Sequence, residues 1–295
     1  MDAPEMDDPR PEATFVADDV EVAELALASY DISPESRLRL LNLSENATYA
    51  VEDATTGDKS ILRVHRKDYH RRHEIESELD WLEALRRDSD VTVPTVLPTR
   101  DGQRVVTVEH DGTARHVVHF DMVAGVEPDE ETLTVHDFHT LGCITASLHD
   151  HSRSWTRPQG FGRFSWDWQH SLVHADLRLA NLLVDGDTIT VIDFDDCGFG
   201  WYFYDFGTAV SFFEDDPAVP EWQEAWVSGY RSRRPLAPSD EAMLPSFVLL
   251  RRLLLLAWMG SHSHSRESQA MSITYAEGSC ALAERYLTFN GQRLA

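Results

Sequence analysis

A change of pattern near residue 123 is the feature that most constrains what this chain can fold into. Before it, short runs of alternating apolar and polar residues are separated by turn sequences, which is typical of antiparallel strands. After it, apolar residues recur at helical spacing. The pattern predicts an α+β fold with two lobes: a small antiparallel sheet with one helix in residues 15–123, and a larger, mainly helical lobe in residues 124–295. A ligand site is expected in the cleft between the lobes.

The first lobe carries the strand pattern in short runs, joined in two places by tight turns. The connections Thr55-Thr-Gly-Asp and His110-Asp-Gly-Thr contain the glycine that hairpin turns favour. A charged stretch repeats Ile75, Leu79 and Leu82 along one face, which predicts an amphipathic helix. The predicted elements are a helix at 20–30, strands at 37–43, 48–53 and 60–65, a helix at 71–87, and strands at 104–109 and 116–122.

Helical spacing dominates the second lobe, with one exception. Residues 181–194 alternate as a hairpin around Asp185-Gly-Asp. The most apolar segment, Leu244 to Gly260, contains Arg251 and Arg252 in mid-run and is too short to span a bilayer uninterrupted, so we interpret it as a buried core helix. The predicted helices are 135–149, 201–213, 221–230, 240–260 and 275–288.

The charge of the chain excludes some classes of partner. Its 51 acidic and 26 basic side chains give a formal charge of -25, which argues against nucleic acid or an anionic membrane as a partner. The hydrophobic content of 42% is ample for a packed core. Residues 1–14 are acidic and rich in proline, so we expect a flexible leader. This leader lacks the basic start and apolar run of a signal peptide. The three cysteines are odd in number and far apart, so they support no disulfide framework or zinc site. Both observations predict a cytoplasmic protein.

One stretch carries the chemistry: His174-Ala-Asp-Leu-Arg-Leu-Ala-Asn181, followed by the hairpin and then by Asp193-Phe-Asp-Asp. An Asp and an Asn share one loop, and a second Asp arrives at the end of the hairpin. Metal-dependent phosphoryl transfer needs one carboxylate near the attacking hydroxyl, and an amide oxygen with another carboxylate to hold Mg²⁺ on the phosphates. The pattern matches the kinase catalytic loop and its metal-binding Asp. We therefore expect ATP and Mg²⁺ as cofactors.

With these motifs the chain resembles the aminoglycoside phosphotransferase family, which includes homoserine, choline and stress-response kinases and has a protein-kinase-like fold. The family signature is His-Gly-Asp with an Asn five positions later, then Ile-Asp-Phe, a glycine and Asp-Leu-Ala. The corresponding residues here are His174-Ala-Asp, Asn181, Ile192-Asp-Phe, Gly198 or Gly200, and Asp205-Phe-Gly. The resemblance covers nearly all of residues 35–290 and implies transfer of the γ-phosphate of ATP to a hydroxyl of a small molecule.

The resemblance implies a role for each polar residue of the catalytic loop. Asp176 would accept or orient the proton of the acceptor hydroxyl, and Arg178 would neutralise charge on the transferred group. Asn181 and Asp193 would hold Mg²⁺. Of the two flanking polar residues, His174 is expected to brace the loop through hydrogen bonds, whereas an Asp at position 205 is expected to cap and tether it. Ala for Gly at position 175 is a departure that leaves the polar atoms in place.

The resemblance also implies that the first lobe binds the nucleotide. The loop that contains Ser44, Asn46 and Thr48 lies between the first two strands, where this fold covers the ATP phosphates with backbone N–H groups and small polar side chains. The backbone of Asp121 and Val123, in the connector between the lobes, is expected to contact the edge of the adenine.

Arg63, on the third strand, stands where the phosphate-binding lysine of this fold is usual. Arginine keeps the charge and can fork onto two oxygens, although the two residue types are not interchangeable. A carboxylate on the following helix is expected to orient Arg63. Glu78 is the first choice because it flanks the apolar face of that helix, and Glu74, one turn earlier on the same side, is the alternative.

Two alternatives to an active small-molecule kinase stay open. Arg63 in place of lysine, and the short stretch 153–171 where many relatives carry a long insertion, agree with a nucleotide-binding pseudokinase scaffold of weak or no activity. A stress-response Ser/Thr protein kinase is the other alternative. The aromatic residues of 153–171 form either an acceptor wall or part of the core. The sequence specifies neither the acceptor nor the oligomeric state.

Overall fold

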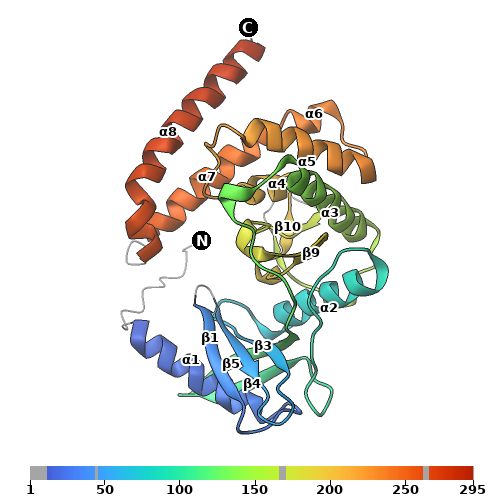
Figure 1. The fold of residues 1–295 in the computed structure, drawn as a ribbon, viewed down its shortest axis with the longest axis vertical. Helices are drawn as coiled ribbons and strands as arrows, with labels where there is room; N and C mark the ends of the chain where they lie inside the picture. Colours follow the sequence, from blue (N-terminus) through green and yellow to red (C-terminus); the bar gives the residue numbers. More distant parts are fainter. Residues whose placement is uncertain (1–11, 44–45, 166–170, 262–265, 295) are drawn as a thin grey trace. The chain divides into compact units, whose positions relative to one another are not determined.

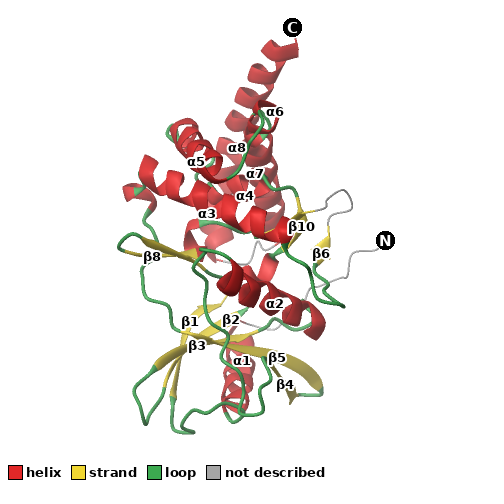
Figure 2. Cartoon of the chain, turned by 90° about the vertical axis from the view of Figure 1, so that its right-hand side faces the viewer, coloured by secondary structure: helices red, strands yellow, loops and turns green. Residues whose placement is uncertain are grey.

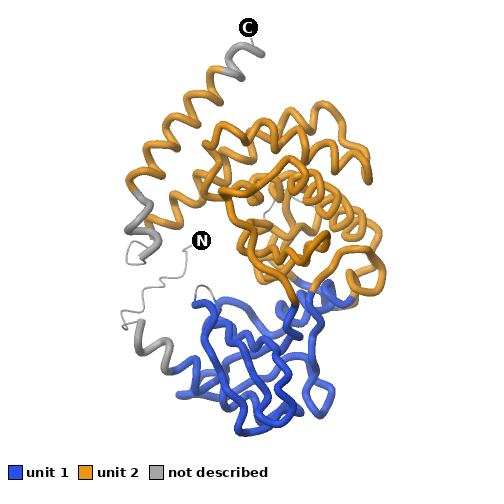
Figure 3. Tube along the Cα trace, viewed as in Figure 1, with its two compact units in different colours: residues 1–83, 94–123, 160–162 blue, residues 84–93, 124–159, 163–295 orange. Residues whose placement is uncertain are grey.

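The computed structural model describes residues 12–43, 46–165, 171–261 and 266–294, and the chain divides into two compact units (Figure 3). Unit 1 comprises residues 1–83, 94–123 and 160–162, and unit 2 comprises residues 84–93, 124–159 and 163–295. The boundary between Val123 and Ala124 lies where the sequence changes from the strand-like to the helical pattern.

Unit 1 is built on one antiparallel sheet of five strands in the order β1-β2-β3-β5-β4 (Figure 1). The turn between β4 and β5 places Asp111 and Gly112 at φ values of 49° and 72°, the left-handed conformation that a two-residue hairpin with Asn-Gly or Asp-Gly favours. The strands are β1 (Arg37–Leu43), β2 (Ala47–Glu52), β3 (Lys59–Val64), β4 (Val105–His110) and β5 (Thr113–Asp121). All five predicted strands are therefore confirmed, with ends shifted by up to three residues.

Two helices accompany this sheet, α1 (Glu12–Leu27) and α2 (Arg72–Asp88) (Figure 2). Apolar residues of α1 form a buried core with one face of the sheet. The helix predicted at 20–30 is shifted toward the N-terminus, because α1 begins at Glu12, inside the segment expected to be a flexible leader, and ends at Leu27. Within α1, Asp19 accepts a hydrogen bond from Arg115 of β5, and Glu21 contacts His110 of β4, so these two acidic residues are tied to the sheet.

Alternation along β3 directs its side chains to opposite faces of the sheet. Leu62 and Val64 belong to the core beneath α1. Arg63 lies between them and therefore points to the other face, where it meets Glu78 of α2. Across the sheet, Arg63 is opposite Thr48 of β2 and Val118 of β5.

Unit 2 is mainly helical, and its largest contact joins α3 (Val135–Ser154) to α5 (Val219–Arg233). Glycine permits this close approach, because a Cβ atom at Gly142 would collide with the carbonyl of Trp226, and one at Gly229 with the carbonyl of His139. The N-terminus of α3 carries a reciprocal capping box between Thr134 and its third helical residue. The other helices are α4 (Tyr204–Ala209), α6 (Pro238–Glu241), α7 (Leu244–Ser261) and α8 (Arg266–Leu294).

The apolar stretch predicted as one core helix at 240–260 is divided into α6 and α7. By length and composition, Pro238–Gly260 is the one stretch of the described residues that is apolar enough to cross a membrane, and it is longer than the predicted segment, Leu244 to Gly260. Core helices pass the same test, and α7 packs against α4 and α8. Phe247 and Leu255 are buried whereas Leu253 and Leu254 are about half exposed, so the predicted burial holds for one face of α7.

Short strands near the catalytic loop were not predicted. A three-stranded sheet has the order β6-β10-β7, with β6 (Phe164–Ser165) parallel to β10 (Gly198–Gly200) and β7 (Ser171–Val173) antiparallel to it. The predicted hairpin at 181–194 is confirmed as β8 (Leu182–Asp185) and β9 (Thr188–Val191). Strands of two or three residues are too short for periodicity to detect.

Candidate active site

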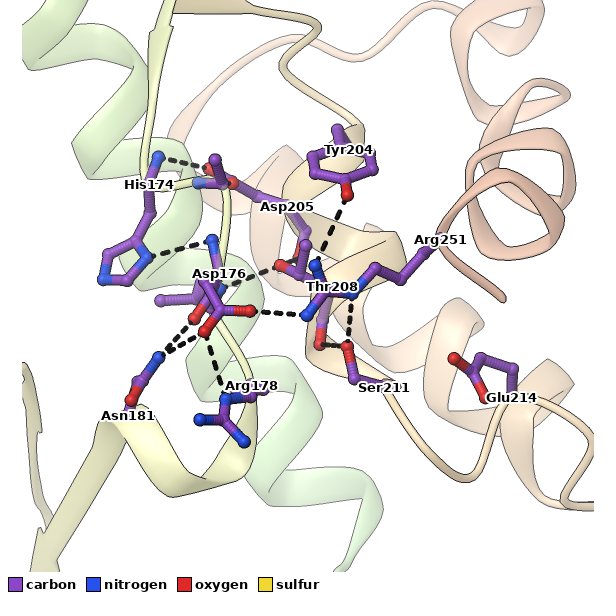
Figure 4. A network of polar contacts seen from close by, with 12 residues as sticks. His174, Asp176, Arg178, Asn181, Tyr204, Asp205, Thr208, Ser211, Glu214 and Arg251 are labelled. Atoms are coloured by element: carbon purple, nitrogen blue, oxygen red, sulfur yellow. Dashed lines mark hydrogen bonds and ion pairs between the residues drawn. The ribbon is translucent and has the colours of Figure 1, made fainter. Parts of the chain in front are cut away.

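The catalytic loop, residues 174–181, joins β7 to β8 and is tethered to α4 by one buried carboxylate (Figure 4). Asp205 Oδ2 accepts the backbone N–H of His174 at 3.2 Å, and Asp205 Oδ1 accepts that of Ala175 at 2.8 Å. The carboxylate thus accepts charge-assisted hydrogen bonds from two backbone N–H groups at the start of the loop. The tether predicted for Asp205 is confirmed.

Neighbouring groups complete this tether from two other sides. His149 of α3 places Nε2 at 3.0 Å from Asp205 Oδ2 and Nδ1 at 3.0 Å from the hydroxyl of Tyr230. Burial lowers the pKa of His149, although Asp205 opposes the shift, so we assign a neutral ring that donates from Nε2. Thr208 Oγ1 accepts the backbone N–H of Leu177 at 2.9 Å. The helical scaffold therefore holds the loop backbone at three amides, those of His174, Ala175 and Leu177.

His174 uses both ring nitrogens within the loop. Nε2 lies 3.1 Å from the carbonyl oxygen of Ile192, which only accepts, so the proton is on Nε2. Nδ1 accepts the backbone N–H of Asp176 at 3.3 Å. The ring also lies 4.5 Å from that of Phe194, measured between centroids. This geometry agrees with the predicted bracing role, because neither nitrogen is left for proton transfer.

Ala175 shows why a glycine is usual at this position of the family signature. Its φ is 69°, in the left-handed region that a side chain with Cβ disfavours by roughly 1–2 kcal/mol. The loop nevertheless adopts this conformation, because Asp205 binds the amides of His174 and Ala175 on adjacent residues. The departure from the family pattern therefore carries a conformational cost, although it leaves the polar atoms in place.

Asp176 is held at both carboxylate oxygens. Oδ2 accepts from Arg178 Nε at 3.1 Å and from Asn181 Nδ2 at 2.9 Å. Oδ1 accepts from Arg251 Nη2 at 2.5 Å. Figure 4 shows these donors converging on the carboxylate from the loop on one side and from α7 on the other.

The charges around Asp176 favour its ionised form. Burial alone would raise the pKa of Asp176, but the guanidinium groups of Arg251 and Arg178 outweigh burial and lower it. Burial likewise opposes the charge on Arg251, and Asp176 outweighs it and raises the pKa of that guanidinium. Two guanidinium groups thus face one carboxylate. These three groups together carry a net charge of +1, in contrast to the charge of -25 on the whole chain.

Asn181 and Asp193 lie at the two ends of the hairpin. The carbonyl oxygen of Asn181 accepts the backbone N–H of Ile192 at 2.9 Å, which brings the residue before Asp193 next to Asn181. The Asn181 Nδ2 group donates to Asp176 O and Oδ2, so its Oδ1 is directed elsewhere. Asp193 has φ 57° and ψ 67°, a left-handed conformation that Asp tolerates better than most residues.

This pair of side chains fits Mg²⁺. Magnesium prefers oxygen ligands and is commonly bound through one or two carboxylates together with substrate phosphates and water. The amide oxygen of Asn181 and the carboxylate of Asp193 are such ligands. The described residues contain no group of three or more His, Cys, Asp or Glu that suits a metal. Two side chains fill only part of the octahedral shell of Mg²⁺, so an ion held by Asn181 and Asp193 would take its other ligands from phosphates and water.

In unit 1, the predicted ion pair between Arg63 and Glu78 is present. Arg63 Nη2 donates to Glu78 Oε1 at 2.6 Å, and their side chains are 6% and 0% exposed. The guanidinium also lies 5.2 Å from the ring centroid of Phe120. Glu74 is used differently, because its Oε2 accepts the backbone N–H of Arg71 at 2.7 Å. Glu78 is thus the partner, and the role of Arg63 in nucleotide binding stays a prediction.

The other residues predicted to bind the nucleotide have mixed surroundings. Asn46 is buried, and its Oδ1 accepts the backbone N–H of Arg66 at 3.0 Å. Thr48 is half-buried on the same face of the sheet as Arg63. Ser44 lies outside the described residues.

The connector residues Asp121 and Val123 close the β5 end of unit 1. The backbone N–H of Asp121 donates to the carbonyl of Thr95 at 2.9 Å, and its carboxylate accepts the N–H of Thr95 at 2.6 Å. The amide of Asp121 is therefore already engaged, and its carbonyl is the group left for the predicted contact with adenine. Val123 is half-buried.

Sequence reasoning missed Arg251, the group closest to Asp176. Arg251 is 75 residues away along the chain, within an apolar helix that carries no motif. One signal was present: charged residues are rarely buried without a partner, so a pair of arginines in an apolar run calls for buried carboxylates. Arg252, next to it, indeed pairs with Glu214 at 2.7 Å and with Asp215 at 2.9 Å.

Comparison with known proteins agrees with this geometry. The family model described as "Phosphotransferase enzyme family" matches residues 158–238, which contain the catalytic loop. The solved structure of a microcompartment-associated aminopropanol kinase is 62% identical, with a TM-score of 0.85, and the match covers 94% of this chain and 100% of that one. The chain belongs to the phosphotransferase enzyme family. The present chain is therefore a kinase that acts on a small molecule and transfers a phosphoryl group to an alcohol. The predicted family and reaction are confirmed.

More distant structures share the fold of the kinase. An amicoumacin kinase in complex with AMP-PNP, Ca²⁺ and Ami is 20% identical, with a TM-score of 0.78 and coverage of 93% of this chain and 96% of that one. A spectinomycin phosphotransferase in complex with ADP and spectinomycin is 12% identical, with a TM-score of 0.57 and coverage of 90% of this chain and 93% of that one. The predicted α+β, protein-kinase-like fold is confirmed, and these relatives were solved with nucleotides bound.

Proposed function

We propose that this kinase transfers the γ-phosphate of ATP to the hydroxyl of a small amino alcohol, with aminopropanol as the first candidate. The observation that carries the proposal is 62% identity over the full length of an aminopropanol kinase. The reaction centre is the loop of Asp176, Arg178 and Asn181. In this arrangement Asp176 contacts the acceptor hydroxyl, and Asn181 with Asp193 would hold Mg²⁺.

The contacts of Asp176 support a role in orienting the hydroxyl. Three donors fix the carboxylate, and its pKa is lowered by Arg251 and Arg178 against the effect of burial, so it is ionised when the alcohol arrives. Phosphoryl transfer passes through a loose transition state that requires little removal of the proton before bond formation. Asp176 therefore aligns the hydroxyl by accepting its hydrogen bond and takes the proton as the new O–P bond forms.

The surplus positive charge supports the other half of the reaction. Arg178 is about one-third exposed and contacts Asp176 through Nε, which leaves its terminal nitrogens for the transferred phosphoryl group. When bound, Mg²⁺ neutralises the charge on the phosphates. In unit 1, we assign Arg63, oriented by Glu78, to the phosphates, the loop with Ser44, Asn46 and Thr48 to their cover, and the backbone of Asp121 and Val123 to adenine.

The similar aminopropanol kinase is associated with a microcompartment, and we extend this association to the present kinase. A location at such a compartment is a refinement of the predicted cytoplasmic location. Co-sedimentation of the kinase with compartment shells tests it. Recovery of the kinase only in the soluble fraction of a strain that builds shells contradicts it.

The substrate is tested by measuring ATP consumption across a panel of acceptors. The panel contains 1-amino-2-propanol, 3-amino-1-propanol, ethanolamine, choline, homoserine, an aminoglycoside and 1,2-propanediol, which lacks the amine. We expect the highest kcat/KM with an aminopropanol and a much lower value with propanediol. The highest value with choline or an aminoglycoside contradicts the assignment of the acceptor. Nucleotide binding without turnover on any acceptor supports the scaffold alternative instead.

The role of Asp176 is tested by Asp176→Asn, which keeps the shape of the side chain and removes its charge. We expect kcat to fall about 10²–10⁴-fold, the usual contribution of a positioned acid or base group. The affinity for ATP, measured by calorimetry, stays within about threefold because the change is at the acceptor side. Asp187→Asn, at the exposed turn of the nearby hairpin, is the matched control. A kcat for Asp176→Asn equal to that of the control removes Asp176 from the mechanism.

A further inference from the structure

Among the residues that the structure describes, Arg251 is the one side chain from outside the catalytic loop that donates to the carboxylate of Asp176. Its Nη2 donates to Asp176 Oδ1 at 2.5 Å, whereas the loop's own donors, Arg178 and Asn181, both bind Oδ2. A carboxylate bonded at one oxygen still rotates about its Cβ–Cγ bond and rocks about Cα–Cβ. Bonds at both oxygens, from opposite sides, remove this freedom.

The guanidinium of Arg251 is itself fixed by the segment that anchors the loop. Nε donates to Ser211 Oγ at 2.9 Å, and Nη1 lies 3.4 Å from the hydroxyl of Tyr204. Ser211 Oγ in turn donates to the carbonyl of Thr208 at 2.7 Å. The side chain of Arg251 is 13% exposed. Each of its three nitrogens therefore has a defined partner, and the α4 region positions both the loop backbone and the arginine.

We infer that Arg251 is a positioning residue of the transfer reaction, which fixes the Asp176 carboxylate from α7 so that it meets the acceptor hydroxyl in one orientation. This inference rests on the proposed role of Asp176. Its expected size follows from geometry, because a misplacement of about 1 Å at a reacting group can cost roughly 10²-fold in rate. Arg251 acts only through Asp176, and this dependence separates positioning from a direct contact with phosphate or acceptor.

A double-mutant cycle on the full-length enzyme provides the test. Arg251→Met removes the guanidinium and keeps most of the volume of the side chain. We expect it to lower kcat about 10²-fold, with the KM values for ATP and for the acceptor changed by less than about threefold. In the Asp176→Asn background, the same substitution should change kcat by less than about threefold, because the group that it positions is already lost.

Three further variants separate positioning from folding. Arg251→Lys keeps the charge and should restore part of the lost kcat. Ser211→Ala leaves Arg251 in place and removes one of its supports, so it should lower kcat by a smaller factor in the same direction. Arg252→Lys is the matched control, since Arg252 is the adjacent buried arginine, pairs with Glu214 and does not contact Asp176. It should leave kcat unchanged even where it lowers Tm.

Each other outcome overturns the inference in a recognisable way. An equal loss of kcat in both backgrounds means that Arg251 contacts phosphate or acceptor directly. A raised KM for the acceptor with unchanged kcat makes it a binding residue. A loss that follows the folded fraction and is shared by Arg252→Lys makes it structural. The proposed function is judged separately, from turnover by the wild-type enzyme and its loss in Asp176→Asn alone.

Discussion

The two units contain ion pairs of opposite design. In unit 1, one carboxylate, Glu78, faces one guanidinium, Arg63, and both lie on regular elements, a helix and a central strand. In unit 2, one carboxylate, Asp176, faces two guanidinium groups, and it lies on a loop that the surrounding helices hold by its backbone. The first pair is balanced in charge, and the second carries a surplus positive charge.

This difference indicates that the charged side chains have different roles in the two units. In the balanced pair the carboxylate orients the cation, and little charge is left over when the nucleotide is absent. In the unbalanced cluster the cations orient the carboxylate, and the surplus suits a reaction in which a highly charged phosphate approaches. The comparison predicts that removing one partner affects mainly stability and nucleotide binding in unit 1, and mainly turnover in unit 2.

The largest expected effect comes from breaking the balanced pair with Glu78→Gln. Arg63 would then be buried without a counter-charge, and losing one partner of a buried pair costs about 3–5 kcal/mol. Urea-induced unfolding of unit 1 measures this decrease in the free energy of unfolding. We also expect a higher KM for ATP, because the guanidinium is no longer oriented.

A double variant tests whether charge balance is the cause. Arg63→Met combined with Glu78→Leu removes both charges and keeps apolar volume, so it should recover most of the lost stability. The affinity for ATP should not recover. Recovery of both would show that Arg63 has no part in binding the nucleotide, whereas a double variant as unstable as Glu78→Gln would refute the argument from balance.

A smaller effect follows from the buried histidines of the two units. Burial lowers the pKa of His119, in β5, from 6.5 to about 4. The folded state therefore binds fewer protons than the unfolded state below pH 6.5, so stability is complete above that pH and declines as pH falls toward 4. The expected loss between pH 7.5 and 4.5 is roughly 2–3 kcal/mol.

The comparison is sharpened by His149 of unit 2. Its pKa is also lowered by burial, but Asp205 opposes the shift, whereas His119 contacts the neutral hydroxyl of Ser60 at 2.7 Å. Acid should thus loosen β5 before α3. Amide hydrogen exchange, measured on both elements at several pH values, checks this order. His119→Gln should flatten the response of β5, and an unchanged response would place the acid-sensitive group elsewhere.

Much of this architecture follows from local sequence, and the rest depends on distant residues. Periodicity located the five strands and the main helices, and helix spacing distinguished Glu78 from Glu74, because both signals are carried by neighbours along the chain. The motif indicated the loop and its tether by Asp205. Arg251 was missed because its partner is 75 residues away, and the sheet of β6, β7 and β10 was missed because its strands are too short to show a period.

The smallest expected effect concerns Ala175. Its backbone is left-handed, unlike the regular strand and helix that carry Arg63 and Glu78. Replacing Ala175 by Gly relieves roughly 1–2 kcal/mol of left-handed strain. It also loses the burial of a methyl group, worth about 0.8 kcal/mol, and adds about 0.4–1 kcal/mol of unfolded-state entropy. These contributions nearly cancel, so Ala175→Gly should change the free energy of unfolding by less than about 1 kcal/mol and leave kcat unchanged. Ala175→Val is the contrasting variant, since a β-branched side chain is a genuine outlier at positive φ. It should lower stability and kcat together, and a Val variant as stable and active as the wild type would show that the loop does not need this conformation.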